Sequence, residues 1–400
     1  VGHAVRAGYM YSGMADVAAI TGDSSYVRAI DRIWENIVGK KIYITGGIGA
    51  RHEGEAFGDN YELPNLTAYN ETCAAIGNVY TNYRLFLLHG DAKYFDVLER
   101  TLYNGLISGV SLDGGRFFYP NPLACDGKYR FNADHTITRQ PWFGCACCPS
   151  NISRFIPSLP GYVYAVKDDK VYVNLFLSNR AKLKVNGKNV VLEQETSYPW
   201  NGDIRLTVAK GNQPFVMNVR IPGWVRGSVL PGGLYSYADG EELAYRVSVN
   251  GQEVKGALQK GYLSIDRRWK KGDVVEIHFD MQPRVVKAND KVAANRGRVA
   301  IEHGPLVYCA EWPDNDFDIS TLLLNRHPKF QVVEHPDLLG GINEITTRAQ
   351  ALSYDATGRL AAKDVKLTLI PYYAWAHRGE GRMEVWLPIE VGAASAELQE

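Results

Sequence analysis

The sequence lacks an excess of charge of either sign. Its 400 residues carry 44 lysines and arginines against 44 aspartates and glutamates, so the formal net charge is zero. No basic stretch indicates nucleic-acid binding, and no apolar run is long enough to cross a bilayer. We therefore expect neither a nucleic-acid partner nor a membrane span. Hydrophobic residues make up 46% of the chain, which is typical of a globular protein with a large core.

An initiator methionine and a signal segment are also lacking. The chain begins at Val1 and enters an apolar helical pattern at once, so we expect it to be a piece of a longer protein, cut within a domain. The compartment stays open between cytoplasm and periplasm, and the sequence predicts no oligomeric state.

A zinc-finger spacing is missing too, although four of the six cysteines fall in two short elements. These elements are Glu-Thr-Cys at 71–73 and Cys-Ala-Cys-Cys-Pro-Ser-Asn at 145–151. Adjacent Cys147 and Cys148 can hardly bridge each other, because disulfide geometry is demanding. Thiolates gathered with a carboxylate favour a zinc site instead. A long gap separates the two elements, so the metal would join distant parts of a larger fold, in an active site or as a structural staple.

Helical periodicity dominates before about residue 160. Apolar residues recur at three- and four-residue steps in the segments 4–21, 25–38, 70–88 and 92–107. Gly-Asp-x-x-Tyr at 22–26 recurs at 90–94, and the same offset relates Asp31 to Glu99. A recurring helix pair favours a helical toroid, with a solenoid as the alternative.

Short strands dominate after residue 160. They are rich in β-branched and aromatic residues and lie at 162–166, 170–176, 204–208, 216–221, 245–249 and 274–279. Asn-Gly at 186–187 and at 250–251 predicts two tight hairpins. A second strand-rich stretch runs from about 291 to 388, so two β-sandwich-like domains fit this half best.

An irregular polar loop at 45–65 lies between the helix pairs. It is rich in glycine and acidic residues, unlike a core strand, and loops on rigid scaffolds often carry function. Its glycines do not follow a dinucleotide or P-loop pattern, so phosphate binding is only weakly indicated. The alternative is an acidic loop that is simply solvated.

Five motifs, in this order, resemble glycoside hydrolase family 127 and the related family 146. They are Gly-Glu-Ala-Phe at 54–57, Tyr-Glu-Leu-Pro-Asn at 61–65, Glu-Thr-Cys-Ala at 71–74, Tyr-Pro-Asn-Pro-Leu at 119–123 and Cys-x-Cys-Cys-Pro at 145–149. The best-known members are β-L-arabinofuranosidases. The resemblance implies an α-then-β multidomain fold: a partial (α/α)6 barrel over 1–159, a β-sandwich domain over 160–285 and a second β-sandwich-like domain over 286–400. It also implies that much of the N-terminal half of the barrel lies outside this chain.

The same resemblance implies roles for individual residues. The implied zinc ligands are Glu71, Cys73, Cys147 and Cys148. Cys147 also matches the nucleophile of the family and Glu55 its acid/base, while His3, Glu99 and Tyr119 match sugar-contacting positions. Glu99 has a structural alternative, because its repeat partner Asp31 suggests a role in helix packing.

These roles describe a retaining exo-glycosidase that releases terminal β-L-arabinofuranose from plant glycans, with Zn2+ as its cofactor and an oligosaccharide or glycan as its partner. Retention needs a nucleophile below the anomeric carbon and an acid above the leaving oxygen. Two alternatives stay open: a related glycosidase for another furanose-like sugar, and a non-catalytic glycan-binding protein with a structural zinc. Because the barrel is expected to be incomplete, we also expect this chain alone to be weakly active or inactive.

Overall fold

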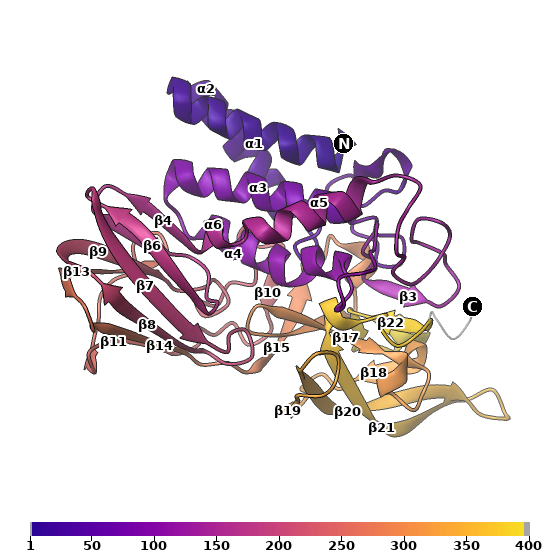
Figure 1. The fold of residues 1–400 in the computed structure, drawn as a ribbon. Helices are drawn as coiled ribbons and strands as arrows, with labels where there is room; N and C mark the ends of the chain where they lie inside the picture. Colours follow the sequence, from indigo (N-terminus) through magenta and orange to yellow (C-terminus); the bar gives the residue numbers. More distant parts are fainter. Residues whose placement is uncertain (1, 396–400) are drawn as a thin grey trace.

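The computed structural model describes residues 2–395, in which a helical layer lies beside two β-rich regions (Figure 1). Helices come first along the chain and strands follow, which confirms the order predicted from the sequence. The helices are α1 (Ala4–Thr21), α2 (Ser24–Lys40), α3 (Thr72–His89), α4 (Lys93–Thr101), α5 (Cys147–Phe155), α6 (Pro160–Val163) and α7 (Val391–Ser395).

The repeat in the sequence corresponds to two helix pairs, α1 with α2 and α3 with α4. Gly22 and Gly90 end the first helix of each pair in the left-handed conformation, with φ of 71° and 63°. The aspartate after each glycine then accepts a backbone N–H of the next helix, Asp23 from Ser25 at 2.8 Å and Asp91 from Lys93 at 3.0 Å. Asp23 is therefore the N-cap of α2, whereas α4 begins after Ala92 and Asp91 closes the turn that leads into it.

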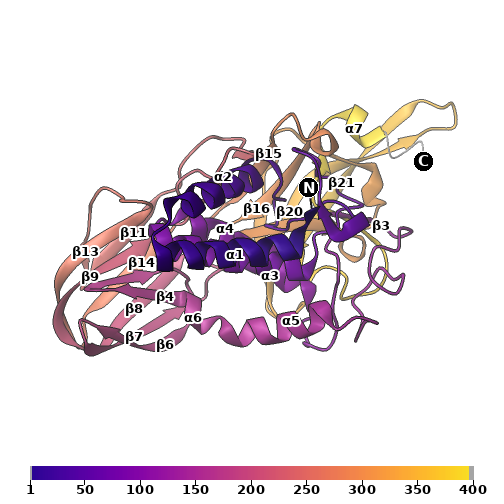
Figure 2. The same ribbon diagram turned by 90° about the horizontal axis from the view of Figure 1, so that it is seen from above.

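Helices α1 and α3 pack side by side at close range (Figure 2). Gly8 of α1 faces Gly77 of α3, and a Cβ on Gly8 would lie only 3.0 Å from the carbonyl carbon of Gly77. Glycine at this crossing therefore allows the two backbones to approach each other closely.

Helix α4 is shorter than its periodicity predicts. It ends at Thr101 and continues as a π-helical turn, Leu102–Leu106, and a 3-10 turn, Ile107–Gly109. The side-chain amide of Asn104 donates to the carbonyl of Pro305 at 2.9 Å, and the amide of Gly105 donates to the carbonyl of Thr45. These contacts with other segments replace the regular helical ladder, which periodicity alone could not reveal.

The first β-rich region contains two sheets. The six-stranded sheet has the order β12 (Gln252–Glu253), β11 (Tyr245–Val249), β14 (Val274–Phe279), β8 (Asp203–Lys210), β7 (Lys188–Thr196), β6 (Asn179–Val185). The four-stranded sheet has the order β13 (Tyr262–Lys270), β9 (Asn212–Arg220), β5 (Lys170–Val173), β4 (Tyr164–Lys167). Both predicted Asn-Gly hairpins are present, since positive φ at Asn186, Gly187, Asn250 and Gly251 joins paired strands.

The second β-rich region is one branched sheet of eleven strands. Its main path runs β10 (Tyr235–Tyr237), β15 (Pro283–Ala288), β16 (Arg298–His303), β17 (Leu306–Glu311), β21 (Leu360–Pro371), β20 (Ile342–Tyr354), β18 (Leu322–Leu324). The branches are β19 (Gln331–His335), β22 (Arg382–Glu384), β23 (Leu387–Pro388) and β3 (Ala124–Asp126). Strand β3 comes from the helical part of the chain, so that part and this sheet are joined by backbone pairing. The domain boundaries drawn from the sequence stay a prediction.

Buried ion pairs fix α4 to both β-rich regions. Glu99 lies 2.5 Å from Arg220 of β9, and Arg100 lies 2.6 Å from Glu302 of β16. All four side chains are at most 3% exposed. Such pairs hold position well but leave a costly uncompensated charge when one partner is lost.

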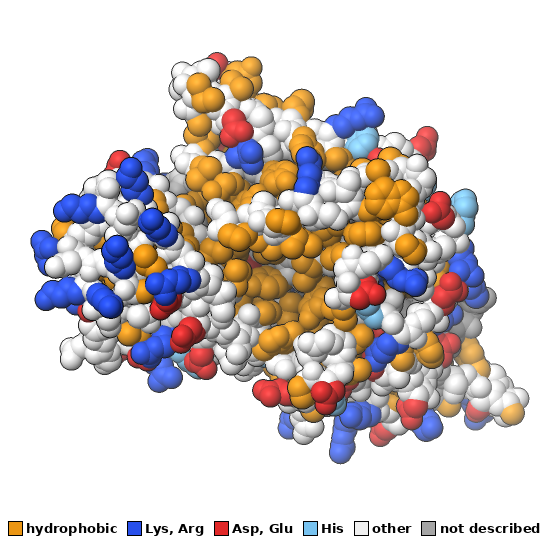
Figure 3. All heavy atoms as spheres, in the orientation of Figure 1, with side chains coloured by type: hydrophobic (Ala, Val, Ile, Leu, Met, Phe, Trp, Pro, Cys, Tyr) orange, Lys and Arg blue, Asp and Glu red, His pale blue; other side chains and the backbone are white. Residues whose placement is uncertain are grey.

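Large apolar side chains remain exposed on the helical layer. Met10, Val17 and Ile20 of α1 and Leu87 of α3 are all exposed, Ile20 by 85%. Figure 3 shows hydrophobic side chains gathered over the centre of one face, between the helices and the β-rich regions. None of the helices within residues 2–395 combines the length and apolar character that a membrane span needs.

Candidate functional site

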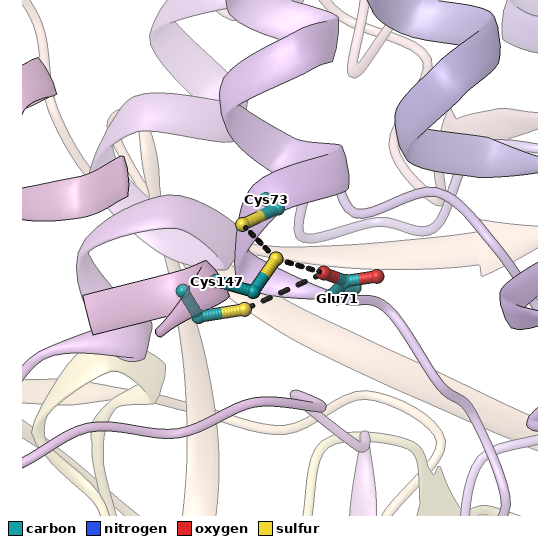
Figure 4. A group of neighbouring side chains, drawn as sticks. Glu71, Cys73 and Cys147 are labelled. Atoms are coloured by element: carbon teal, nitrogen blue, oxygen red, sulfur yellow. Dashed lines mark hydrogen bonds between the residues drawn. The ribbon is translucent and has the colours of Figure 1, made fainter. Parts of the chain in front are cut away.

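Four side chains from two helix starts meet at one point (Figure 4). Glu71 immediately precedes α3 and Cys73 lies in its first turn, while Cys147 and Cys148 begin α5. The Sγ atoms of Cys73 and Cys147 are 3.1 Å apart, and Oε1 of Glu71 lies 3.3 Å from Sγ of Cys147 and 3.5 Å from Sγ of Cys148. One ligand atom from each residue lies within 4.8 Å of all the others. The structure therefore brings together the four residues predicted as metal ligands.

The chemistry of this group fits a metal ion. Glu71, Cys73 and Cys148 are at most 1% exposed, and within residues 2–395 Oε2 of Glu71 has no hydrogen-bond partner. A buried carboxylate that has no partner for one oxygen is costly unless a cation compensates it. Three thiols and one carboxylate form a donor set of the kind that zinc prefers. The group could bind a metal, and its composition favours zinc.

The protons of the group are distributed unevenly. Burial and the neighbouring Cys147 raise the pKa of Glu71 to about 9. The pKa of Cys147 falls far below its ordinary value, because the side chains of Cys148, Cys73 and Tyr119 donate hydrogen bonds to its sulfur. Burial raises the pKa of the Cys148 thiol. Cys147 is thus the sulfur that carries the negative charge most readily.

Glu55 lies beside this group, and each of its two carboxylate oxygens contacts another side chain. His3 Nε2 lies 2.9 Å from Oε2, and the hydroxyl of Tyr69 donates to Oε1 at 3.1 Å. Strand β1 (Gly2–His3) pairs with β2 (Ala56–Phe57) so that His3 faces Ala56, which places His3 next to Glu55. The negative charge of Glu55 contributes to the raised pKa of Glu71. His3 and Glu55 are therefore neighbours at the edge of the metal-ligand group.

The backbone of Glu55 is strained. Its φ is 49°, a left-handed value that is uncommon for any residue other than glycine. It closes a single 3-10 turn, Glu53–Glu55, inside the polar loop. Strain of this kind persists only where surrounding contacts determine the conformation, and it gathers at functional sites.

Tyr119 lies at the same site. It is half-buried, its hydroxyl bonds to the sulfur of Cys147, and its ring packs edge-on against Phe143. The carbonyl of Tyr119 accepts the backbone N–H of Thr72 at 3.0 Å, which joins its loop to the start of α3. Tyr119 therefore contacts the sulfur of Cys147 directly.

Glu99 is not brought to this group. It is 2% exposed, and its Oε1 accepts from Arg220 at 2.5 Å and from the hydroxyl of Tyr198 at 2.8 Å. Within the described part of the chain its partners are thus an arginine and a tyrosine of the first β-rich region. This placement agrees with the packing alternative that the repeat suggested, and the sugar contact of Glu99 stays a prediction.

Tyr69 is a site residue that sequence reasoning missed. It precedes the Glu-Thr-Cys element by two positions, yet an aromatic residue in such a segment is more often a core residue, and nothing in the motif marks its hydroxyl. The ring is 6% exposed and packs against His52, with centroids 5.0 Å apart. Its hydroxyl reaches Glu55 across 14 residues of chain. Only the folded loop reveals that contact.

Comparison with protein families gives one consistent result. Three family models match consecutive parts of the chain: the catalytic domain of family 127, described as β-L-arabinofuranosidase, over residues 1–161; the middle domain of the same family over 170–281; and its C-terminal domain over 283–388.

Individual relatives agree with the family models. The chain is 37% identical to a non-reducing end β-L-arabinofuranosidase of Bifidobacterium longum, over 96% of this chain and 59% of that protein. It is similar to a solved family 127 β-arabinofuranosidase at 75% identity and a TM-score of 0.95, covering 98% of this chain and 61% of that one. A solved β-L-arabinofuranosidase from Geobacillus stearothermophilus matches at 41% identity and a TM-score of 0.89, covering 97% and 60%. The chain thus spans about three fifths of the length of these relatives.

Proposed function

The chain belongs to glycoside hydrolase family 127, and from this premise we propose that it acts as a retaining exo-glycosidase that releases terminal β-L-arabinofuranose from plant glycans. The observation that carries the proposal is the group formed by Glu71, Cys73, Cys147 and Cys148, with Glu55 beside it. A structural zinc staple would need only the four ligands. The carboxylate at its edge supplies the proton-transfer group that glycoside hydrolysis requires.

We assign Cys147 as the nucleophile and Glu55 as the acid/base. Glu55 donates a proton to the leaving oxygen while Sγ of Cys147 bonds to the anomeric carbon and the glycosidic bond breaks. Glu55 then takes a proton from water, which attacks the same carbon and releases the sulfur. Two inversions at one carbon give net retention. Zn2+ bound by the four ligands would keep the thiols deprotonated at neutral pH.

Burial supports Cys147 over Glu71 as the attacking group. Among the four ligand residues, Cys147 alone is partly exposed, whereas Glu71, Cys73 and Cys148 are buried. A nucleophile must reach a carbon of the substrate, so the accessible sulfur is the better candidate. Its lowered pKa acts in the same direction, since the thiolate is the reactive form.

Within this proposal His3 and Tyr119 contact the bound sugar, since both flank the catalytic pair. The two helix pairs are adjacent parts of an (α/α)6 barrel, and the exposed apolar side chains of α1 and α3 are the surfaces that further helices of such a barrel would cover. The three-domain division at 159 and 285 belongs to the same proposal.

A covalent label tests the assignment. The full-length protein is treated with an arabinofuranose analogue that carries a reactive anomeric group, digested, and mapped by mass spectrometry. We expect a thioglycoside on the peptide that contains Cys147. Label on the peptide containing Glu71, with Cys147 unmodified, would reverse the assignment. Parallel assays with other furanosides decide the sugar: faster cleavage of one of them would favour the related glycosidase instead.

A further inference from the structure

The proposed acid/base leaves one question of positioning, which is how Glu55 keeps its orientation. Its backbone is strained, its side chain is about one third exposed, and it sits in a loop rather than in a long helix. Flexible carboxylates sample several rotamers, and misplacement of a catalytic group by about 1 Å can cost on the order of 100-fold in rate. Contacts to the carboxylate itself must therefore fix it.

Two side chains provide those contacts, and they differ in how firmly they are held. His3 reaches Oε2 from the two-residue strand β1, and its Nδ1 has no hydrogen-bond partner within residues 2–395. Tyr69 reaches Oε1 from the segment that leads into α3. The carbonyl of Tyr69 accepts the backbone N–H of Asn121 at 3.0 Å, so its main chain is fixed to the loop that carries Tyr119.

The ring of Tyr69 is fixed as well. It packs against the ring of His52 at 5.0 Å and lies 6.2 Å from the ring of Tyr119. A tyrosine buried for packing alone also needs a partner for its hydroxyl, and a backbone carbonyl commonly serves. Here the partner is instead a carboxylate oxygen of the proposed acid.

We propose that Tyr69 is a positioning residue for the acid/base, a role that rests on the proposed function. By donating to Oε1, while His3 contacts Oε2, it fixes the plane of the Glu55 carboxylate. Each carboxylate oxygen has two lone pairs, so the bond from Tyr69 does not block proton transfer. Tyr69 itself touches neither the sugar nor the nucleophile in this role.

A comparison of leaving groups tests the role. A dinitrophenyl group departs without protonation, whereas a methyl group needs the acid. In the full-length protein, we expect Tyr69→Phe to lower kcat/KM for methyl β-L-arabinofuranoside by ~10- to 100-fold and for the dinitrophenyl glycoside by less than ~3-fold. The ratio of the two values is independent of how much of the variant is folded, so partial misfolding does not affect it.

Tyr235→Phe is the matched control. Tyr235 is 4% exposed, and its hydroxyl donates to the carbonyl of Ile42 at 2.9 Å, so the substitution makes the same chemical change in a buried site elsewhere. We expect its ratio of methyl to dinitrophenyl activity to equal that of the wild type.

Glu55→Gln provides the second control. If Tyr69 acts through Glu55, adding Tyr69→Phe to Glu55→Gln leaves the ratio where Glu55→Gln alone puts it. Equal losses on both substrates in Tyr69→Phe, or a methyl-specific loss that persists in the Glu55→Gln background, would overturn the positioning role. A wild-type protein that cleaves neither substrate would instead overturn the proposed function. The failure of the positioning role and the failure of the proposed function are therefore distinguishable.

Discussion

Two buried glutamates, Glu71 just before α3 and Glu99 within α4, have opposite surroundings. Glu71 and Glu99 are 1% and 2% exposed, and burial raises the pKa of both. Glu99 has an arginine within 2.5 Å and a tyrosine hydroxyl within 2.8 Å. Glu71 has thiols as its neighbours, and within residues 2–395 its Oε2 has no hydrogen-bond partner. The protein thus supplies a cation for the buried carboxylate of Glu99 but none for that of Glu71.

This contrast separates a carboxylate that is paired within the protein from one that could bind a metal. Desolvation costs both residues several kcal/mol before compensation. At Glu99 the chain supplies the cation itself, and the product is a contact between α4 and the first β-rich region. At Glu71 the raised pKa favours the neutral acid, and a bound cation would instead stabilise the carboxylate. The adjacent sulfurs favour a thiophilic metal for that role. Four predictions concern these buried groups and their neighbours.

The largest expected effect is on activity at the thiol group. In the full-length protein, we expect Cys147→Ala to lower kcat by on the order of 1,000-fold or more, because the nucleophile is lost. Cys145→Ala is the matched control: Cys145 is exposed and lies outside the four-residue group, so its activity should stay near wild type. Steady-state hydrolysis of an aryl β-L-arabinofuranoside measures both. Activity retained by Cys147→Ala would remove the assignment.

The second effect is on metal content. Purified wild-type protein should carry about one zinc per chain, whereas Glu71→Gln should lose most of it on dialysis, since an amide is a poorer ligand than a carboxylate. Glu99→Gln should keep its zinc, because Glu99 is paired with Arg220 and stands apart from the ligand group. Elemental analysis by mass spectrometry measures both. Equal metal content in the two variants, or a wild type with no zinc, would contradict the assignment of Glu71 as a zinc ligand.

The third effect is on stability. Here Glu99→Gln should have the larger effect and Glu71→Gln the smaller one, the reverse of their effects on metal content. After chelation, Glu99→Gln should lower the free energy of unfolding by about 3 kcal/mol, because Arg220 loses one of its two buried carboxylate partners. Glu71→Gln should be close to neutral in the same metal-free protein, since it removes a carboxylate that no cation of the chain compensates. Urea denaturation followed by circular dichroism gives both values. A larger loss for Glu71→Gln than for Glu99→Gln would contradict this reading.

The structure brings Glu71 into the predicted ligand group and places Glu99 in an ion pair with Arg220, and the two outcomes differ for a physical reason. Glu71 lies two residues from a cysteine, so local spacing already indicates joint ligation. The partners of Glu99, Arg220 and Tyr198, are about 100 residues away in another region, and no local pattern reveals a pairing across that distance. The offset repeat with Asp31 gave the only indication, and Asp31 is also paired, with His89 at 2.9 Å.

The same distinction holds for the fold. Features set by a few adjacent residues were predicted well: the bounds of α1 and both Asn-Gly hairpins. Features set by distant contacts were not, such as the π-helical turn after Thr101, which depends on Pro305 and Thr45, and the pairing of β3 with β22. Tyr69 belongs to this second class.

The last expected effect concerns His303, which follows the paired Glu302 in the chain. His303 is 5% exposed, and burial lowers its pKa from 6.5 to about 4. Below pH 6.5 the unfolded chain binds a proton that folded His303 does not, so stability falls as the pH drops and stops falling below about pH 4. The shift corresponds to a loss of about 3 kcal/mol over that window.

His303→Gln removes this titration. Unfolding by urea at pH 7 and pH 4 should therefore show a smaller loss of stability at acid pH in the variant than in the wild type. Because burial also lowers the pKa of His377 to about 4, the variant keeps part of the acid loss. An unchanged difference between the two pH values would mean that His303 is already charged in the folded protein, and that a buried cation is tolerated here without a carboxylate partner.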